Sequence, residues 1–589
     1  MEVRTDHKKT WFKIIYFARP YIIKQKYRFT LTMIVLIAGS TVSSISPYIW
    51  GRIIDSIMIG HIMDLIKWLS LYLCVILLIM CLRFLEDHLR QKLCFITESE
   101  IRKALLNRIL NMQCKDLDQF DIGFMVSSVI SDAGRVSSFV FDVLTSIVTI
   151  GVNIVVALYF SISISFLLSA TSFVFIPFSI VSNLALRKYF RQLSESQREY
   201  RDQSSSFYIG TLGHIVEIKA YCLENDSINK FNRLTRTGWG LQRKRFTLEM
   251  KTSLLSTFIS SLSTATTLIL STYLIATGSF SLGGMVSFQK YVDRFTSSVS
   301  TLMQMNFSAQ STCVAVDRII SMLSHDDENL YASRISAPFS IAKLEFKGVC
   351  FRYLSNAEVL KSVEFCLDSP GIYAVVGENG CGKSTVLKLI MRFYRVQAGR
   401  ILLNGISIDD ISTEAIRKSV GYYSKDVYIQ DGTLRENLLL GSTGNKSNID
   451  TKILENICVQ IGLQDFIAAL PQGLETHVGE NGKLLSSGQK QKIATVRAVL
   501  DEASVLLFDE ITSDLDGESE KRIMSVIHSL AQSRIVLMVT HRIQSVLFAT
   551  HVMLLEDGHL TDSGTHEDLM QSSSKYRSLF EKQNDLSNH

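Results

Sequence analysis

Six stretches of about 20 or more mostly apolar residues fill the first half of the chain, and each is long enough for an α-helix to cross a bilayer. Hydrophobic residues make up 47% of the 589 residues, charged residues only 20%, and Pro occurs just 6 times. This composition is unusual for a soluble enzyme and ordinary for a membrane protein with a soluble half. We therefore predict six transmembrane helices, near residues 28–50, 64–87, 137–160, 163–186, 252–277 and 286–312.

The distribution of Lys and Arg predicts the orientation of these helices. Basic residues crowd the N-terminal arm and the connections between spans two and three and between spans four and five, whereas the connections near residues 59–60, 161–162 and 278–279 carry almost none. Cytoplasmic loops carry the excess of Lys and Arg, so both termini are expected in the cytoplasm. The stretch from Trp11 to Lys24 mixes aromatic and basic residues and predicts an interfacial elbow helix. A cleaved signal peptide is not expected.

A phosphate-binding loop follows the apolar half. Residues 377–384 read G-E-N-G-C-G-K-S and match the pattern G-x-x-x-x-G-K-[ST], between an apolar strand-like run and a helix-like run. In such a loop backbone N–H groups and a helix N-terminus surround phosphate, a Lys supplies charge and a hydroxyl holds Mg²⁺. The alternative is a Gly-rich turn that matches the pattern by chance, and such a turn would not need a strand before it and a helix after it. We predict nucleotide contacts from Gly377, Glu378, Asn379, Gly380, Cys381, Gly382, Lys383, Ser384 and Thr385.

Two further strand ends carry polar residues suited to phosphoryl chemistry. The apolar run at residues 505–508 leads into Asp509 and Glu510, and the run at residues 535–539 leads into Thr540 and His541. Asp509 is expected to reach the Mg²⁺ shell, and Glu510 to polarise the attacking water as a general base. His541 is expected to contact the γ-phosphate or orient the water, although an isolated His is more often structural. The predicted catalytic residues are Lys383, Glu510 and His541, and the predicted metal ligands are Ser384 and Asp509.

The soluble half is predicted to be an α/β P-loop NTPase domain. A polar, acidic stretch separates it from the apolar half, which predicts an all-α polytopic membrane domain with long intracellular helical extensions over residues 1–320, a linker over 321–340 and the nucleotide-binding domain over 341–589. The 10 Cys residues are scattered without a C-x-x-C pair. Reduced thiols are therefore expected, rather than a disulfide framework or a zinc site.

Residues 485–489 read L-S-S-G-Q and open a predicted helix between the phosphate loop and the strand that ends in His541. Together these motifs resemble the ATP-binding cassette family, whose signature would read L-S-G-G-Q there. The resemblance implies that Ser486, Ser487, Gly488 and Gln489 close on ATP held by the opposite nucleotide domain, and that Tyr353 stacks on adenine. It therefore implies that two chains pair and enclose two ATP molecules together with Mg²⁺.

Six spans before one nucleotide domain resemble an exporter half-transporter of this family. The resemblance implies ATP-driven export of a peptide, amphipathic small molecule or drug by alternating access, with helices near residues 114–124 and 209–224 coupling the domains. The expected partners are a second half-transporter chain, in a homodimer or heterodimer, membrane lipid and the substrate, with no nucleic acid. The expected location is the cytoplasmic (inner) membrane of a bacterium. Alternatives are a flippase for a lipid or lipid-linked substrate, and an ATP-gated regulator or channel.

The chain departs from the family pattern at two positions. Lys425 stands where the family has Gln, and its ammonium has only donors and would repel a metal ion. Either a water, Ser424 or Asp426 replaces the lost ligand, or Lys425 itself neutralises phosphate charge. Ser487 stands where the family has Gly, which keeps the N–H but removes conformational freedom. An altered signature beside an intact Glu510 is compatible with a heterodimer and equally with a homodimer of unusual sites.

Polar residues inside the predicted spans are candidates for a transport pathway. Span five carries many hydroxyls, which either pack against neighbouring helices or line a wet cavity. Asp293 and Arg294 are adjacent ionisable residues inside span six, where charges are expensive. They indicate either a pathway or a salt bridge.

Overall fold

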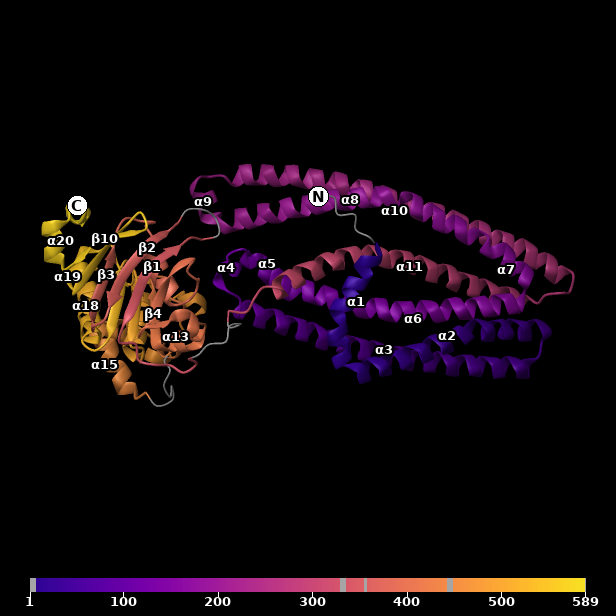
Figure 1. Ribbon diagram of the computed structural model, residues 1–589. Coiled ribbons are helices and arrows are strands. Elements are labelled where there is room, and N and C mark those ends of the chain that lie inside the picture. Colours follow the sequence, from indigo (N-terminus) through magenta and orange to yellow (C-terminus); the bar gives the residue numbers. More distant parts are fainter. Residues whose placement is uncertain (1–6, 329–334, 354–357, 442–448, 588–589) are drawn as a thin grey trace. The chain divides into compact units, whose positions relative to one another are not determined.

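The computed structural model describes residues 7–328, 335–353, 358–441 and 449–587 (Figure 1). Its internal contacts divide the chain into two units. The first unit, called here the membrane unit, comprises Met1–Leu105 and Val126–Ser321. The second, the nucleotide unit, comprises Leu106–Met125 and Met322–His589. The segment Leu106–Met125, which lies in the predicted membrane domain, therefore packs with the nucleotide unit.

The membrane unit is entirely helical among the described residues. Its helices are α1 (His7–Lys24), α2 (Lys26–Ile59), α3 (Ile62–Leu110), α5 (Ile122–Ser127), a π-helical turn (Ser128–Asp132), α6 (Ala133–Ile164), α7 (Phe166–Phe173), α8 (Phe175–Gly213), α9 (Ile215–Ala220), α10 (Glu224–Ala276) and α11 (Leu282–Leu323). In the described residues, four helical stretches are long and apolar enough to cross a membrane: Lys26–Ile59, Ile62–Leu110, Ile122–Ile164 and Glu224–Ala276. The predicted helical membrane domain is confirmed.

The predicted connection near residues 161–162 is wrong. These residues lie inside α6, and the chain turns instead at Ser165, which has extended backbone angles (φ −161°, ψ 116°). The Ser165 hydroxyl accepts a hydrogen bond from the backbone N–H of Leu168 and so caps α7. The sequence around this point is apolar on both sides, so hydropathy does not mark the turn. The other two short connections fall between helices as predicted, beginning at Gly60 and Thr277.

Long helices carry the chain well beyond the length of a bilayer span. α3 has 49 residues and α10 has 53, which at 1.5 Å per residue is more than twice the 30 Å hydrocarbon core of a bilayer. α8 and α10 run side by side and α7 also packs on α10, whereas α2 and α1 pack on α6 (Figure 1). The predicted long helical extensions are therefore present, and α8 and α10 form a helical hairpin.

Two glycines bring the end of α2 against the start of α11. A Cβ atom on Gly51 would lie 2.5 Å from the Gly283 carbonyl oxygen, and one on Gly283 would lie 2.0 Å from the Gly51 carbonyl oxygen. Asp55 accepts hydrogen bonds there from the Gly283 backbone N–H at 2.8 Å and from the Ser281 hydroxyl at 3.1 Å. The Tyr291 hydroxyl donates to the α2 backbone at 2.9 Å. The close backbone contact at Gly51 and Gly283 and the hydrogen bonds to Asp55 thus hold α2 and α11 together.

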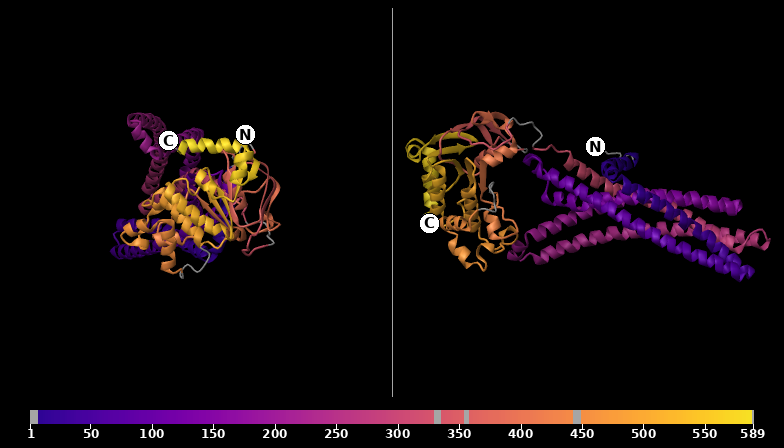
Figure 2. Two further views of the ribbon diagram at one scale, coloured as in Figure 1. Left: turned by 90° about the vertical axis from the view of Figure 1, so that its left-hand side faces the viewer. Right: turned by 90° about the horizontal axis from the view of Figure 1, so that it is seen from below.

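The nucleotide unit contains two β-sheets (Figure 2). The first is antiparallel, in the order β2 (Leu360–Leu367), β1 (Leu344–Phe351), β4 (Ala398–Leu403) and β5 (Ile406–Ser407). The second has the order β10 (His559–Gly564), β9 (His551–Glu556), β3 (Gly371–Val376), β8 (Ile535–Val539), β7 (Val505–Asp509) and β6 (Val420–Ser424). All of its pairings are parallel except β10 with β9.

Helices and apolar side chains cover the larger sheet. The helices of this unit are α4 (Cys114–Leu117), α12 (Lys383–Ile390), α13 (Thr413–Ser419), α14 (Leu434–Leu438), α15 (Thr451–Ile461), α16 (Gln464–Ala469), α17 (Ser487–Leu500), α18 (Gly517–Ala531), α19 (Ile543–Leu547), α20 (His566–Ser572) and α21 (Ser574–Ser587). One buried cluster fills the space between the two sheets, and another packs α15, α17 and α18 on the larger sheet. Every residue of β3 is buried, as expected for a central parallel strand. The predicted α/β domain is confirmed, and the carboxyl ends of β3, β7 and β8 meet at one edge.

The segment around α4 is bound to the nucleotide unit by polar contacts. The Tyr394 hydroxyl donates to Asp118 at 2.7 Å, and His325 lies 3.6 Å from Asp116. Arg417 forms a two-pronged ion pair with Glu328 at 2.8 and 2.9 Å. Glu328, the last described residue before position 335, is thereby fixed to α13.

Candidate nucleotide-binding site

The phosphate loop connects β3 to α12 and has the backbone conformation that its glycines allow. Gly377, Gly380 and Gly382 have φ values of 154°, 85° and 107°. A Cβ atom on Gly377 would lie 2.1 Å from the Leu555 carbonyl oxygen, and one on Gly382 would lie 3.0 Å from the Val359 carbonyl oxygen. Side chains are therefore excluded at both positions by space as well as by φ.

Lys383 begins α12 and its side chain is 6% exposed. Its ammonium donates to the backbone carbonyls of Gly377 at 2.9 Å and Glu378 at 2.8 Å, so the loop itself holds the charge. Thr385, two residues on, shares a hydrogen bond with the Tyr353 hydroxyl at 3.2 Å. The predicted adenine-stacking ring is therefore at the end of β1 beside this helix, edge-on to Phe351 and to Tyr394.

The two predicted metal ligands are in direct contact. The Ser384 hydroxyl donates to Asp509 Oδ1 at 2.7 Å, and the Tyr422 hydroxyl donates to Oδ2 at 3.2 Å. Burial raises the Asp509 pKa, while these two hydrogen bonds oppose the rise. Burial and the Asp509 carboxylate also raise the Tyr422 pKa, so this phenol keeps its proton. Tyr422 was not predicted; only its place on β6, which pairs in parallel with β7, could have indicated it.

A hydroxyl and a carboxylate are a donor set that suits Mg²⁺. In nucleotide sites this ion takes one or two protein oxygens and completes its shell with waters and phosphates. The described residues contain no group of three or more His, Cys, Asp or Glu side chains that could hold a metal. Ser384 and Asp509 therefore fit a metal that is bound jointly with nucleotide, and not a site built from protein ligands alone.

Glu510 and His541 follow neighbouring parallel strands and face each other. His541 Nδ1 lies 3.6 Å from Glu510 Oε1, and the two side chains are 43% and 30% exposed, respectively. Glu510 has a φ of 54°, which is unusual for a residue with a side chain and is typical of functional sites. Its backbone N–H donates to the Val539 carbonyl at 3.1 Å, which fixes the carboxylate next to β8.

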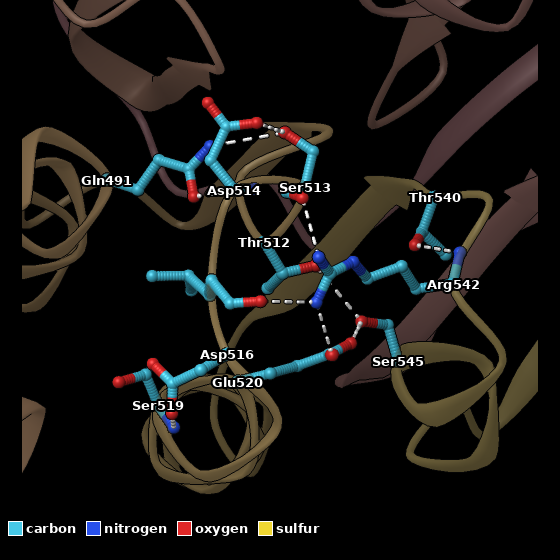
Figure 3. A network of polar contacts seen from close by, with 11 residues as sticks. Gln491, Thr512, Ser513, Asp514, Asp516, Ser519, Glu520, Thr540, Arg542 and Ser545 are labelled. Atoms are coloured by element: carbon cyan, nitrogen blue, oxygen red, sulfur yellow. Dashed lines mark hydrogen bonds and ion pairs between the residues drawn. The ribbon is translucent and has the colours of Figure 1, made fainter. Parts of the chain in front are cut away.

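Arg542 holds in place residues 513–515, which follow Asp509 and Glu510. This role of Arg542 was not predicted from the sequence. Its guanidinium donates to the carbonyls of Ser513 at 2.6 Å and Leu515 at 2.8 Å, and to the Glu520 carboxylate at 2.8 Å (Figure 3). The Glu520 side chain is only 4% exposed and also accepts from Ser545 at 2.8 Å. Arg542 thus joins residues 513–515 and Glu520 of α18 to the segment that contains His541.

The signature segment caps α17. The Ser486 hydroxyl accepts from the Gln489 backbone N–H at 3.2 Å, and the Gln489 side chain accepts from the Ser486 N–H at 2.8 Å. Ser487 is exposed at the first position of the helix. Gly488 packs against the backbone of residue 514, where a Cβ would lie 3.4 Å from the carbonyl oxygen. Among the described residues, no hydrogen bond joins this segment to the phosphate loop.

The Lys425 side chain points toward residues 513–515, which follow Asp509 and Glu510. Its ammonium lies 3.1 Å from Asp514 Oδ1, while its backbone N–H donates to the Asp509 carbonyl at 2.9 Å. The Ser424 hydroxyl, a candidate replacement ligand, donates to the Asp426 carbonyl at 3.1 Å. Cys381 is partly buried, and burial raises the pKa of its thiol although Lys383 opposes the rise.

Comparisons with known proteins agree with this arrangement. The ABC transporter family model matches residues 360–513, and the ABC transporter transmembrane region model matches residues 29–299. The chain belongs to the ABC transporter family. A candidate export ATP-binding/permease protein of Rickettsia bellii is 27% identical over 517 residues, which cover 87% of this chain and 89% of the relative. An ATP-dependent lipid A-core flippase of Thiobacillus denitrificans is 26% identical and covers 95% of this chain and 96% of the relative.

Further similarities support the exporter layout of this ABC transporter. A candidate multidrug export ATP-binding/permease protein of Bacillus subtilis is 27% identical over 96% of this chain and 98% of the relative. The solved structure of a bacterial Atm1-family ABC exporter with ATP bound shares the fold, with a TM-score of 0.80 at 19% identity over 95% of this chain and 98% of that chain. One membrane domain and one ATP-binding domain in a single chain make this protein an exporter half-transporter, an integral membrane protein that binds and hydrolyses ATP.

Some hydroxyls of the fifth predicted span are packing groups in the described structure, whereas Ser253, Ser260, Ser261 and Thr272 are exposed. Ser263, Thr267 and Ser271 are buried in a line along α10, and Thr267 shares a hydrogen bond with Ser172 of α7 at 2.9 Å. Asp293 is exposed and accepts from Gln289 at 3.0 Å. Arg294 is partly buried, and no ion pair between it and Asp293 is present in the described part of α11.

Proposed function

We propose that this half-transporter, as a dimer, couples ATP hydrolysis to the export of a peptide, amphipathic small molecule or drug across the bacterial cytoplasmic membrane by alternating access. The observation that carries the proposal is the juxtaposition of the Ser384–Asp509 contact with the Glu510–His541 pair at the carboxyl ends of β7 and β8. ATP binding drives closure only if the closed, outward-facing state binds ATP more tightly. The termini and nucleotide unit lie in the cytoplasm under this proposal.

Ser384 and Asp509 would hold Mg²⁺ together with the nucleotide phosphates. The ion would neutralise charge on the β- and γ-phosphates. Glu510 orients and polarises the attacking water from a strained backbone position, and His541 is close enough to hold the same water or the γ-phosphate. Lys383 supplies a cation at the loop, once its present hydrogen bonds to loop carbonyls exchange for phosphate oxygens.

The separation of the signature segment from the phosphate loop supports a dimer. The backbone N–H groups of Ser486 and Gln489 are bonded to each other's side chains at the start of α17, so an anion from another chain would meet this helix start at the N–H groups of Ser487 and Gly488. Each ATP would then contact the phosphate loop of one protomer and residues 486–489 of its partner. Whether the partner is an identical chain is a question for mass measurement of the purified complex.

Substrate chemistry is the open part of this proposal, and a second candidate has specific support. One relative is named as a lipid A-core flippase and another as a candidate multidrug export protein, with almost equal identities of 26% and 27%. The buried hydroxyl line on α10 serves packing, so it favours neither class. A lipid or lipid-linked substrate flippase is therefore the second candidate.

The experiment is a panel of peptides, amphipathic drugs and lipids tested on the protein reconstituted into liposomes. The readouts are stimulation of ATPase activity and ATP-dependent movement of a fluorescent substrate, with Glu510→Gln as the inactive control. Stimulation by drugs or peptides together with vectorial movement supports export, and transbilayer movement of labelled lipid supports the flippase. An ATPase rate that no compound alters, with no ATP-dependent movement, would contradict both.

A further inference from the structure

Three segments of the nucleotide-binding site meet at one residue, Asp514. The Lys425 ammonium, just after β6, lies 3.1 Å from Asp514 Oδ1. The Ser513 hydroxyl donates to the same oxygen at 3.3 Å (Figure 3). Gln491 of α17 accepts from the Asp514 backbone N–H at 3.3 Å. Ser487, at the start of the same helix, is among the groups that lower the Asp514 pKa. Lys425, one of the two departures from the family pattern, is thus paired with Asp514.

The backbone of Lys425 lies beside a proposed metal ligand. Ser424 pairs with Asp509 in the parallel register of β6 and β7, and the Lys425 N–H donates to the Asp509 carbonyl at 2.9 Å. The Lys side chain is a flexible four-carbon stem that ends in a compact cation. The Lys425 backbone is fixed beside Asp509. The same side chain that reaches Asp514 could therefore place its ammonium at the Asp509 carboxylate if Asp514 were absent.

We propose that Asp514 is a positioning residue that holds the Lys425 ammonium away from Asp509 and Ser384, so that this cation does not compete with the nucleotide-bound metal. The inference rests on the proposed Mg²⁺-dependent function. It explains how a chain with Lys in place of Gln keeps a usable metal site: the extra positive charge is neutralised on a neighbouring segment. Arg542 holds that segment in place through the Ser513 and Leu515 carbonyls.

The ion pair acts locally and contributes little to the stability of the fold. The Lys425 and Asp514 side chains are 46% and 29% exposed, and pairs this exposed are screened by water and salt. The hydrogen bond from Lys425 is the largest of several effects that lower the Asp514 pKa, so the carboxylate is charged throughout the neutral range. Its removal should therefore change metal binding much more than it changes the unfolding temperature.

The test uses the full chain with Glu510→Gln, which blocks hydrolysis and leaves binding measurable. Binding of Mn²⁺ is followed by electron paramagnetic resonance at saturating ATP, and ATP binding without metal is measured in EDTA. The variants are Asp514→Asn, Lys425→Gln, the double variant and Asp514→Glu. Glu414→Gln is the matched control, because it breaks an exposed pair of a Lys ammonium and a carboxylate, Lys418–Glu414 of α13 at 2.7 Å, that is not part of the nucleotide-binding site.

Asp514→Asn is expected to weaken Mn²⁺ binding about three- to fivefold, the range that a partly exposed ion pair supplies. Asp514→Glu and the Glu414→Gln control are expected to bind Mn²⁺ as the Glu510→Gln background does. Lys425→Gln and the double variant should bind it at least as tightly, because the amide oxygen of Gln can itself coordinate the metal. ATP binding in EDTA should not weaken in Asp514→Asn, because the freed cation remains near the phosphates. High salt should weaken Mn²⁺ binding more in the background than in Lys425→Gln, which tests the ion pair without removing Asp514.

Two results would overturn the inference: unchanged Mn²⁺ affinity in Asp514→Asn, or a double variant that binds as weakly as Asp514→Asn. The second result would show that the carboxylate itself, and not the released cation, matters. Failure of the proposed function looks different. In that case the Glu510→Gln background itself would bind no Mn²⁺ in the presence of ATP, whatever residue stands at position 514.

Discussion

Asp55 near the end of α2 accepts a hydrogen bond from the backbone N–H of Gly283 at the start of α11, at 2.8 Å. A side chain of α2, the helix that contains the first predicted span, thereby caps α11, the helix that contains the sixth. The structure gives Gly51 and Asp55 a physical role, because both lie where α2 contacts α11.

Replacing Asp55 by Ala should loosen this junction. Loss of a capping acceptor costs about 1 kcal/mol, so the thermal unfolding temperature of the detergent-solubilised protein should fall. Gly51→Val should lower it further, since even its Cβ would lie 2.5 Å from the Gly283 carbonyl oxygen. Asp64→Asn is the control, because Asp64 pairs only with nearby Lys67 at 3.4 Å on an exposed surface. Equal unfolding temperatures for Asp55→Ala and the control would contradict the role of this cap.

Glu510→Gln should reduce ATP turnover by about 10²- to 10⁴-fold while ATP binding persists, since a general base contributes in this range. His541→Ala should lower turnover less if its role is to orient the water that Glu510 polarises. Steady-state ATPase assays and equilibrium binding of a fluorescent ATP analogue separate these effects. Turnover within tenfold of the unmodified protein in Glu510→Gln would remove Glu510 from the proposed catalytic role.

Arg542→Gln should destabilise the nucleotide unit by about 3 kcal/mol, because it leaves the 4% exposed Glu520 carboxylate without its cation. Turnover should fall as well, since residues 513–515 lose their anchor. Arg522→Gln provides the comparison: Arg522 pairs with Glu518 on the exposed surface of α18, where such pairs contribute little. Chemical denaturation followed by hydrogen–deuterium exchange of peptides from the nucleotide unit measures the stability of both variants, and a steady-state ATPase assay measures their turnover. Similar losses in the two variants would contradict the structural role of Arg542.

Cys381 should react slowly with thiol reagents, and ATP should protect it. Burial raises the pKa of its thiol above the ordinary value of 9.0, so the reactive thiolate is scarce at neutral pH and the alkylation rate should still be rising above pH 9. ATPase activity should fall in step with labelling, because the loop borders the nucleotide. Mass spectrometry of the modified peptide, with exposed Cys222 as the internal reference, follows the reaction. Full activity after complete labelling of Cys381 would rule out this expectation.

Sequence reasoning succeeded where the relevant physics is local. The phosphate loop and the acidic strand end depend on short patterns, so Ser384 and Asp509 could be named before their 2.7 Å contact was known. It failed where chain segments far apart decide the outcome. The Lys425–Asp514 pair joins residues whose separation in the chain gives no signal, and the turn at Ser165 interrupts a continuous apolar stretch. Arg542 was not predicted because its guanidinium donates to backbone carbonyl groups, which every residue has and which no sequence pattern marks.

The most direct test of the account is whether the phosphate loop of one chain meets the signature segment of another. Ser486→Cys is introduced into the Glu510→Gln protein, with Cys381 retained and the other cysteines replaced, and disulfide formation is followed by non-reducing electrophoresis with and without ATP and Mg²⁺. The account predicts that nucleotide brings residue 486 of the partner chain against Cys381 while it shields this thiol from reagents in solution, so a covalent dimer forms with ATP and Mg²⁺ and is lost when Cys381 is replaced by Ala. A protein that stays a single chain at saturating ATP and Mg²⁺ would contradict it.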